Sequence, residues 1–211
     1  MKKVAVSIHA TDNFNTKIIE KLEGFDYFHI DVMDGRFVDN KTDNLNVVHN
    51  IRNNYNTPII AHLMVINPIE YFKKIYKFID IFLFHFEINY DIDEILREVK
   101  RYNVKVGLAI NPETPISKIV PFLSKIDLVL VMSVNPGWSG QEFLPCSIKK
   151  VNELSKLKEN NNFLIDVDGG INLQIASLLS NTDILTSSST ILKAEDPNRI
   201  IKLLRESDRN G

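Results

Sequence analysis

Short apolar runs alternate with amphipathic stretches along the whole chain. The runs are rich in β-branched and aromatic residues, which is typical of strands, and the stretches between them carry apolar residues at helical spacing. The predicted strands are 3–8, 27–33, 59–65, 81–86, 104–110, 127–134, 162–168 and 183–187. The predicted helices are 14–23, 44–54, 68–78, 91–102, 115–123, 146–159, 172–180 and 197–206. Three of these helices have a proline near the first turn, which is typical of a helix start.

Strands that alternate with helices predict βαβ units and therefore a parallel sheet. Eight such units in 211 residues indicate an α/β fold, a single (β/α)₈ TIM barrel, which usually takes about 200–250 residues. The alternative is an open doubly wound sheet, but no Gly-x-Gly-x-x-Gly follows the first strand. We therefore expect residues 1–211 to form one barrel domain with its functional groups at the carboxyl ends of the strands.

Composition narrows the classes of function. A hydrophobic content of 44% is enough for one sizeable core, and a net charge of −2 gives no basic surface for nucleic acid or an anionic membrane. Cys146 is the only cysteine, which excludes an internal disulfide and favours a reducing compartment. No apolar run approaches the ~20 residues that span a bilayer, and the first apolar run is too short for a signal peptide. We therefore expect a cytoplasmic protein.

Polar side chains recur at the ends of the predicted strands. His29 and Asp31 share one face of the second strand because successive side chains alternate between faces. His62 lies near the end of the third strand, and Asp168 ends the seventh. A buried carboxylate needs a hydrogen-bonding or ionic partner. If the second strand is considered alone, its histidine and aspartate could simply be each other's partners in the core. Only the combination of several strands favours a functional site.

Two imidazoles and two carboxylates at the ends of different strands predict a metal site. The ligands would be His29, His62, Asp31 and Asp168. Such a mixed set suits Zn²⁺, Fe²⁺, Mn²⁺ or Co²⁺ better than Mg²⁺ or Ca²⁺. The spacing matches no local metal motif, so the site is a hypothesis. Among the other histidines, we interpret His85 as a core residue bonded to a neighbour and His49 as an exposed residue of a helix.

The ends of the later strands add two further features. Met33, Met64 and Met132 lie at strand ends near the predicted ligands, where they either fill the core or line a cavity. Loops rich in glycine and serine follow the last three strands, at 135–140, 168–170 and 187–189. Barrels often bind phosphate at their last loops, where glycine lets backbone N–H groups approach an anion. We therefore expect an anion site there.

The chain resembles the ribulose-phosphate 3-epimerase family in motifs that occur in order from the first strand to the seventh. The matching stretches are Ser7-Ile8, 29–38 with Asn40, 62–65 with Pro68, 107–112 with Thr114-Pro115, 131–137, Gly140-Gln141, Phe143 and 167–171. The resemblance covers nearly the whole chain. The runs at 29–35 and 167–171 are its most specific parts.

The resemblance implies a metal-dependent isomerase of the pentose phosphate pathway that interconverts D-ribulose 5-phosphate and D-xylulose 5-phosphate. It implies that Asp31 and Asp168 transfer the proton at C3 on opposite faces of the substrate, through an enediolate. It implies a divalent metal, commonly Zn²⁺, on His29, Asp31, His62 and Asp168. Substrate contacts are implied for Ser7, His62, Met33, Met64, Met132, Gly137, Trp138, Ser139, Gly140, Gly169, Gly170, Ser188 and Ser189. The expected partner is a small phosphorylated ketose, and we also expect a homo-oligomer.

The chain departs from the family pattern at several positions. His9 stands where an aliphatic residue is usual, and Asp39 stands where proline is usual. Trp138-Ser139 replaces Phe-Gly, and 188–190 reads Ser-Ser-Thr where Gly-Ser-Ala is usual. None of these positions is a predicted metal ligand, so the departures bear on the substrate and not on the reaction type.

Two alternative functions therefore remain open. One is a 3-epimerase of another ketose phosphate such as D-allulose 6-phosphate. The enzyme that acts on this sugar is also similar to the present chain at 27–31 and 111–115. The other is a phosphosugar-binding protein without catalysis, because a fold does not by itself fix a function.

Overall fold

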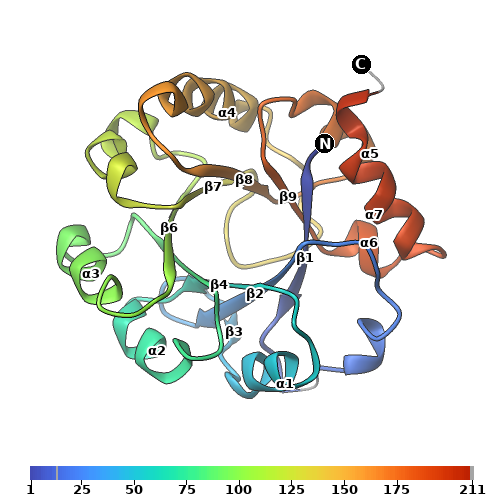
Figure 1. The fold of residues 1–211 in the computed structure, drawn as a ribbon, viewed down its shortest axis with the longest axis horizontal. Coiled ribbons are helices and arrows are strands. Elements are labelled where there is room, and N and C mark those ends of the chain that lie inside the picture. Colours follow the sequence, from blue (N-terminus) through green and yellow to red (C-terminus); the bar gives the residue numbers. More distant parts are fainter. Residues whose placement is uncertain (13, 210–211) are drawn as a thin grey trace.

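A closed ring of parallel strands forms the centre of the computed structural model, which describes residues 1–12 and 14–209 (Figure 1). The ring strands are β1 (Lys3–His9), β2 (Tyr27–Asp34), β4 (Ile59–Met64), β5 (Ile81–His85), β6 (Lys105–Ile110), β7 (Leu128–Met132), β8 (Leu164–Asp168) and β9 (Ile184–Ser187). Each strand pairs in parallel with its neighbours along the chain, and β1 pairs with both β2 and β9, which closes the ring. The prediction of a (β/α)₈ barrel is confirmed, and each predicted strand is present.

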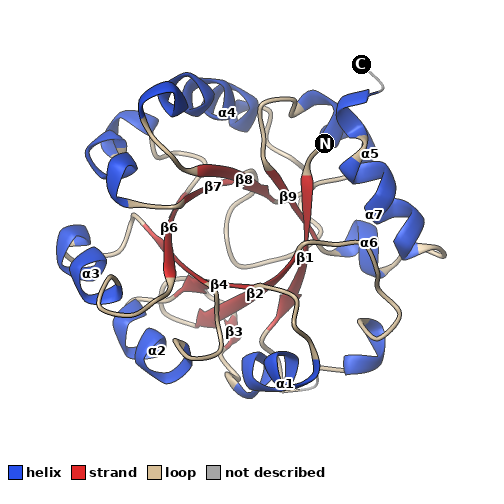
Figure 2. Ribbon diagram, viewed as in Figure 1, coloured by secondary structure: helices blue, strands red, loops and turns tan. Residues whose placement is uncertain are grey.

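Helices cover the outside of this ring (Figure 2). They are α1 (Asn46–Asn54), α2 (Pro68–Ile75), α3 (Ile92–Val99), α4 (Cys146–Leu157), α5 (Leu173–Leu178), α6 (Ser189–Leu192) and α7 (Pro197–Arg205). Side-chain caps fix several starts: Asn67 accepts a hydrogen bond from the backbone N–H of Glu70, and Asp196 accepts one from Arg199. Six of the predicted helices are confirmed, with ends that differ by a few residues. None of the helices in the described residues is long and apolar enough to cross a membrane.

The predicted helix at 14–23 is wrong, and the one predicted at 115–123 is present as 3₁₀ and not α-helix. The first segment contains only a 3₁₀ helix, Thr16–Ile18, because its β-branched residues favour other conformations and the N–H of Glu23 donates to Asn198 instead. The second contains two 3₁₀ helices, Ile116–Lys118 and Val120–Lys125. Pro121 lies inside it, and a proline removes a backbone donor and clashes with the preceding turn of an α-helix.

Two short elements have no counterpart among the predictions. Strand β3 (Lys41–Thr42) pairs antiparallel with the end of β2, and α6 occupies part of the loop expected after the last strand. An element of two residues carries no periodicity, so the hydrophobic pattern could not reveal β3.

The core has two layers because side chains alternate along each strand. Phe28, Ile30 and Val32 point outward and belong to the cluster between strands and helices. A second cluster, which includes Leu83 and Leu130, fills the interior of the barrel. Toward the carboxyl ends of the strands, polar side chains replace this apolar filling. The fold therefore delivers the polar residues of several strands to one end of the barrel.

Candidate active site

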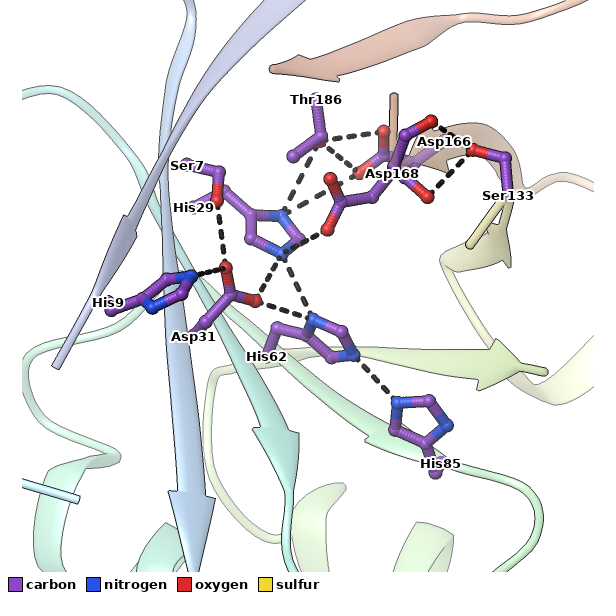
Figure 3. A network of polar contacts seen from close by, with 11 residues as sticks. Ser7, His9, His29, Asp31, His62, His85, Ser133, Asp166, Asp168 and Thr186 are labelled. Carbon is purple, nitrogen blue, oxygen red and sulfur yellow. Dashed lines mark hydrogen bonds and ion pairs between the residues drawn. The ribbon is translucent and has the colours of Figure 1, made fainter. Parts of the chain in front are cut away.

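Four polar side chains meet inside the carboxyl end of the barrel (Figure 3). His29 and Asp31 come from β2, His62 comes from β4, and Asp168 ends β8. His62 Nδ1 lies 2.8 Å from Asp31 Oδ1, and His29 Nε2 lies 3.2 Å from His62 Nδ1. His29 Nε2 also lies 3.8 Å from Asp168 Oδ2. The structure thus brings together the four side chains predicted as ligands.

This cluster has the donor atoms and spacing that a divalent metal ion requires. One ligand atom from each residue lies within 4.8 Å of the other three. Ligand atoms of a tetrahedral site with bonds of about 2.0–2.2 Å are separated by about 3.3–3.6 Å. The separations from His29 Nε2 to His62 Nδ1, Asp31 Oδ1 and Asp168 Oδ2 are 3.2, 3.3 and 3.8 Å, and that between His62 Nδ1 and Asp31 Oδ1 is shorter, at 2.8 Å. Nitrogen and carboxylate oxygen together suit several transition metals, so the cluster fits a divalent ion without selecting one.

The surroundings of Asp31 differ from those of Asp168. Burial alone would raise the pKa of Asp31, but the neighbouring His29 lowers it well below its usual value. Burial and the negative charge of Asp31 raise the pKa of Asp168 to about 8. Without a bound cation, Asp31 is therefore ionised at neutral pH while Asp168 holds a proton.

The two histidines of the cluster also differ. Burial lowers the pKa of His62 to about 3, although Asp31 acts in the opposite direction. Burial would lower the pKa of His29 as well, but Asp31, Asp168 and Asp166 together raise it to about 9. An imidazolium cannot ligate a metal, so a cation would have to displace the proton of His29.

Asp166 and Thr186 lie behind His29, and neither is among the site residues predicted from the sequence. Asp166 Oδ2 is 3.9 Å from His29 Nδ1, and the Thr186 hydroxyl donates to both oxygens of Asp166 at 2.9 and 3.0 Å. Burial raises the pKa of Asp166 to about 6. Asp166 shares the inward face of β8 with Asp168, so strand alternation was the signal that could have found it.

His85 and Glu87 lie behind His62. His85 Nε2 is 2.9 Å from His62 Nε2, and His85 Nδ1 is 3.2 Å from Glu87 Oε2. The interpretation of His85 as a core histidine bonded to a neighbour is confirmed, and that neighbour is one of the four clustered residues. The interpretation of His49 as exposed is wrong, because α1 holds this ring half-buried against Phe78, with ring centroids 4.2 Å apart.

A cavity opens above the cluster, with Asp31 and Asp168 in its lining. His62 is the one predicted substrate contact that does not line it, because this residue is fully buried beneath. The other predicted contacts line the cavity: Ser7, Met33, Met64, Met132, Gly137, Trp138, Ser139, Gly140, Gly169, Gly170, Ser188 and Ser189. Ser7 also donates a hydrogen bond of 2.8 Å to Asp31 Oδ2.

Hydrogen bonds hold the loops at the rim of the cavity. Gln141 Nε2 donates to the carbonyls of Asn135 and Trp138 at 2.6 and 2.8 Å, and Asn40 Nδ2 donates to that of Gly137 at 3.0 Å. These bonds fix the backbone of the loop between β7 and α4. The Trp138 side chain itself remains 62% exposed.

The positions that depart from the family pattern surround the same cavity. His9, Trp138, Ser139 and Ser188 all line it, and His9 Nε2 lies 4.0 Å from Asp31 Oδ2. Asp39, which is exposed, and Thr190, by contrast, lie outside the lining. Four of the departures are therefore placed where they could alter the choice of substrate.

Comparisons with known proteins match this chain to one family. A family model described as "Ribulose-phosphate 3 epimerase family" matches residues 3–192. The ribulose-phosphate 3-epimerase of Schizosaccharomyces pombe is 35% identical over 97% of this chain and 93% of its own length. The enzyme of the same name from Aquifex aeolicus is 39% identical over 82% of this chain and 80% of its own length.

Solved structures with much lower sequence identity share the fold. The 3-hexulose-6-phosphate synthase of Salmonella typhimurium superposes with a TM-score of 0.70 at 16% identity, over 97% of both chains. A protein named KGPDC from Streptococcus mutans superposes with a TM-score of 0.71 at 12% identity, over 98% of this chain and 97% of its own. At such identities the likeness supports the barrel and no particular reaction.

Proposed function

Because the chain belongs to the ribulose-phosphate 3-epimerase family, we propose that it is a metal-dependent 3-epimerase of D-ribulose 5-phosphate and D-xylulose 5-phosphate. The observation that carries this proposal is the cluster of His29, Asp31, His62 and Asp168 beside a cavity at the carboxyl end of the barrel. That end is where barrels of this type carry their catalytic groups.

Asp31 and Asp168 would be the acid–base pair. Inversion at C3 of a 2-ketose phosphate requires removal of a proton next to the ketone and delivery of a proton to the opposite face. One group must begin as a base and the other as an acid, and Asp31 and Asp168 both reach the cavity, from the different strands β2 and β8. Asp31 would accept the proton in one direction of the reaction, and Asp168 would donate its own.

The same four residues would hold a divalent cation, for which we propose Zn²⁺, with Fe²⁺, Mn²⁺ and Co²⁺ as alternatives. When bound, such a cation would act as a Lewis acid and stabilise the negative charge on the oxygens of the enediolate. This stabilisation is needed because a carboxylate is too weak a base to form the enediolate unaided. Ser7 would orient Asp31 through its hydrogen bond of 2.8 Å to Oδ2.

The rest of the cavity would hold the sugar and its phosphate. Three methionine side chains line the cavity and would form an apolar wall beside the substrate: Met33 from β2, Met64 from β4 and Met132 from β7. The rim loops, which contain 137–140, 169–170 and 188–189, would bind the phosphate. Binding energy from this remote end would orient C3 between the two aspartates.

Proton exchange measured by NMR tests the function directly. The protein is loaded with Zn²⁺ and incubated in D₂O, first with D-ribulose 5-phosphate and then with D-allulose 6-phosphate. We expect deuterium at C3 of the pentulose together with its C3 epimer. Asp31→Asn and Asp168→Asn should each abolish the exchange, while Asp127→Asn, at the amino end of β7, should leave it unchanged.

The use of two substrates in this experiment distinguishes the proposed function from its two alternatives. Exchange confined to the hexulose would move the assignment to a hexulose-phosphate epimerase, which the departures that line the cavity would then explain. Binding of both sugars with no exchange, under Zn²⁺, Fe²⁺, Mn²⁺ and Co²⁺ in turn, would contradict catalysis and favour a phosphosugar-binding protein.

A further inference from the structure

A chain of side-chain contacts runs from the candidate metal cluster to the far side of His62, where Figure 3 shows His85 behind it. His62 Nε2 lies 2.9 Å from His85 Nε2, and His85 Nδ1 lies 3.2 Å from Glu87 Oε2. Both imidazoles are fully buried, and the side chain of Glu87 is 21% exposed. These contacts exclude water from the two histidines and make each ring depend on its neighbour for a hydrogen-bond partner.

Glu87 is held as an acceptor at the outer end of this chain. Its Oε1 accepts hydrogen bonds from the backbone N–H of Asn111, at 2.8 Å, and from the Thr114 hydroxyl. These donors favour the ionised carboxylate, which can only accept hydrogen bonds. The contact between Glu87 Oε2 and His85 Nδ1 therefore requires the proton of that imidazole to be on Nδ1.

The direction of the remaining hydrogen bonds follows from this requirement. A neutral imidazole has one N–H and one bare nitrogen, so His85 Nε2 must be the acceptor of its contact with His62. His62 then carries its proton on Nε2, and its Nδ1 presents a lone pair. That lone pair faces the cluster, where His62 Nδ1 lies 2.8 Å from Asp31 Oδ1.

The opposite pair of tautomers, with the protons on His62 Nδ1 and His85 Nε2, is unfavourable at the contact between His85 and Glu87. If His62 carried its proton on Nδ1, His85 would donate from Nε2 and its bare Nδ1 would face the carboxylate of Glu87 at 3.2 Å. In the favoured arrangement the two close acceptors are instead His62 Nδ1 and Asp31 Oδ1, inside the cluster. A cation that binds both atoms would offset the repulsion between these two acceptors.

We propose that Glu87, acting through His85, is a positioning residue that fixes His62 as the Nε2–H tautomer and so aims its Nδ1 lone pair at a divalent cation. The proposal rests on the proposed function, because it takes His62 to be a ligand. A second hydrogen-bond partner on a ligating histidine typically accounts for a 10–100-fold difference in metal affinity. Here that partner is itself a histidine, and a carboxylate sets its orientation.

Glu87→Gln tests this role with little change in shape. The amide of glutamine can donate to His85 Nδ1, so the variant no longer dictates which nitrogen of His85 carries the proton. Asp127→Asn is the matched control, because it also neutralises a carboxylate that accepts a backbone N–H, from Val106, at the other end of the barrel. Zn²⁺ affinity is measured by competition with a chromophoric chelator, and ¹⁵N NMR of labelled histidines reports the tautomer of His85.

We expect Glu87→Gln to bind Zn²⁺ about 10–100-fold more weakly than the wild type, and Asp127→Asn to bind as the wild type does. We also expect His85 to be the Nδ1–H tautomer in the Zn²⁺-loaded wild type. Equal affinities of wild type and Glu87→Gln, or an Nε2–H tautomer of His85, would overturn the proposal. A wild type that binds no divalent cation would overturn the metal dependence as well, so the two failures are distinguishable.

Discussion

Several titratable side chains at the carboxyl end of the barrel are buried, and burial destabilises their charged forms. Asp168 is the clearest case, because burial and the neighbouring Asp31 raise its pKa to about 8. A carboxyl group that holds its proton at neutral pH is suited to donate it. The raised pKa of Asp168 also means that its ionisation destabilises the folded protein, because two neighbouring carboxylates, Asp31 and Asp168, are then both charged.

This destabilisation predicts that Asp168→Asn stabilises the metal-free protein at high pH. The unfolded carboxyl has a pKa near 4 and the folded one a pKa of about 8, so the folded state binds more protons between these values. Its contribution to stability therefore falls as pH rises from about 4 to about 8, and asparagine removes that fall. In urea unfolding with a chelator present, the variant should gain at least ~1 kcal/mol at pH 8 over the wild type.

The same experiment at pH 5 supplies the control for Asp168→Asn. There the wild-type carboxyl is protonated in the folded state, so the gain should be much smaller than at pH 8. A gain that is the same at both pH values would mean that packing, and not the carboxyl pKa, is responsible.

The sequence predicted the individual residues of the candidate metal cluster but not the residues that contact the cluster from behind. His29, Asp31 and Asp168 followed from strand alternation and from the position of each strand end. The role of Asp166 depends on its contact with His29, a residue 137 positions away (166 − 29) on another strand. Periodicity within one strand does not report which side chains of distant strands touch, and this is why His85 was interpreted only as a core residue.

At the rim of the cavity, Gly169 in the loop after β8 lies against Val134 in the loop after β7. Its φ is +119°, and a Cβ built there would lie 2.5 Å from Val134 Cγ2. The loop after β8 is also held by Ser133, whose hydroxyl lies 2.8 Å from the Asp168 carbonyl and 2.7 Å from that of Gly169. Side chain and backbone thus fix the loop that carries Asp168.

Gly169→Ala is therefore expected to be costly. The new methyl group would overlap Val134 and the backbone would be strained, so we expect a loss of at least ~2 kcal/mol in the free energy of unfolding. Epimerisation should fall as well, because Asp168 would shift. Gly24→Ala is the control: φ is +76° there, but nothing lies within 4 Å of the added carbon. It should cost about 1 kcal/mol and leave the activity intact, and equal losses in the two variants would contradict the close approach.

The elements were predicted well wherever the hydrophobic pattern is long and regular. The barrel strands are fully or nearly fully buried apolar runs, and α2 and α7 begin with a cap followed by proline. The failures have local causes. Pro121 interrupts an apolar pattern that otherwise fits a helix, and a two-residue strand such as β3 is too short to have a pattern at all.

In the whole molecule, a buried lysine ties the first residues to the last helices. Lys2 is 1% exposed, and its Nζ donates to the Ala176 carbonyl at 2.8 Å and to the Ser207 hydroxyl at 3.0 Å. The same nitrogen lies 2.6 Å from Asp208 Oδ1. This set of contacts holds the start of β1 against α5 and against the segment that follows α7.

Lys2→Met should destabilise the barrel without changing its chemistry. The substitution keeps most of the buried stem but removes the hydrogen bonds to the Ala176 carbonyl and the Ser207 hydroxyl, and we expect a loss of about 2 kcal/mol in urea unfolding. Lys17→Met, on an exposed lysine of the first 3₁₀ helix, should have almost no effect. Lys2 lies far from the cavity lining, so the KM of the Lys2→Met enzyme should match that of the wild type. A Lys2→Met protein as stable as the wild type would show that these contacts contribute nothing.

The seam of the barrel has a consequence for synthesis on the ribosome. Strand β1 is made well before β9, yet β9 is one of its two neighbours, with Lys3 opposite Ile184. At translation rates of about 5–20 residues per second, β1 waits roughly 10–40 s for that neighbour. During this time its apolar edge, which includes Val4 and Val6, offers unpaired backbone groups to other nascent chains. The nascent polypeptide is therefore most in need of chaperones before its last strand emerges.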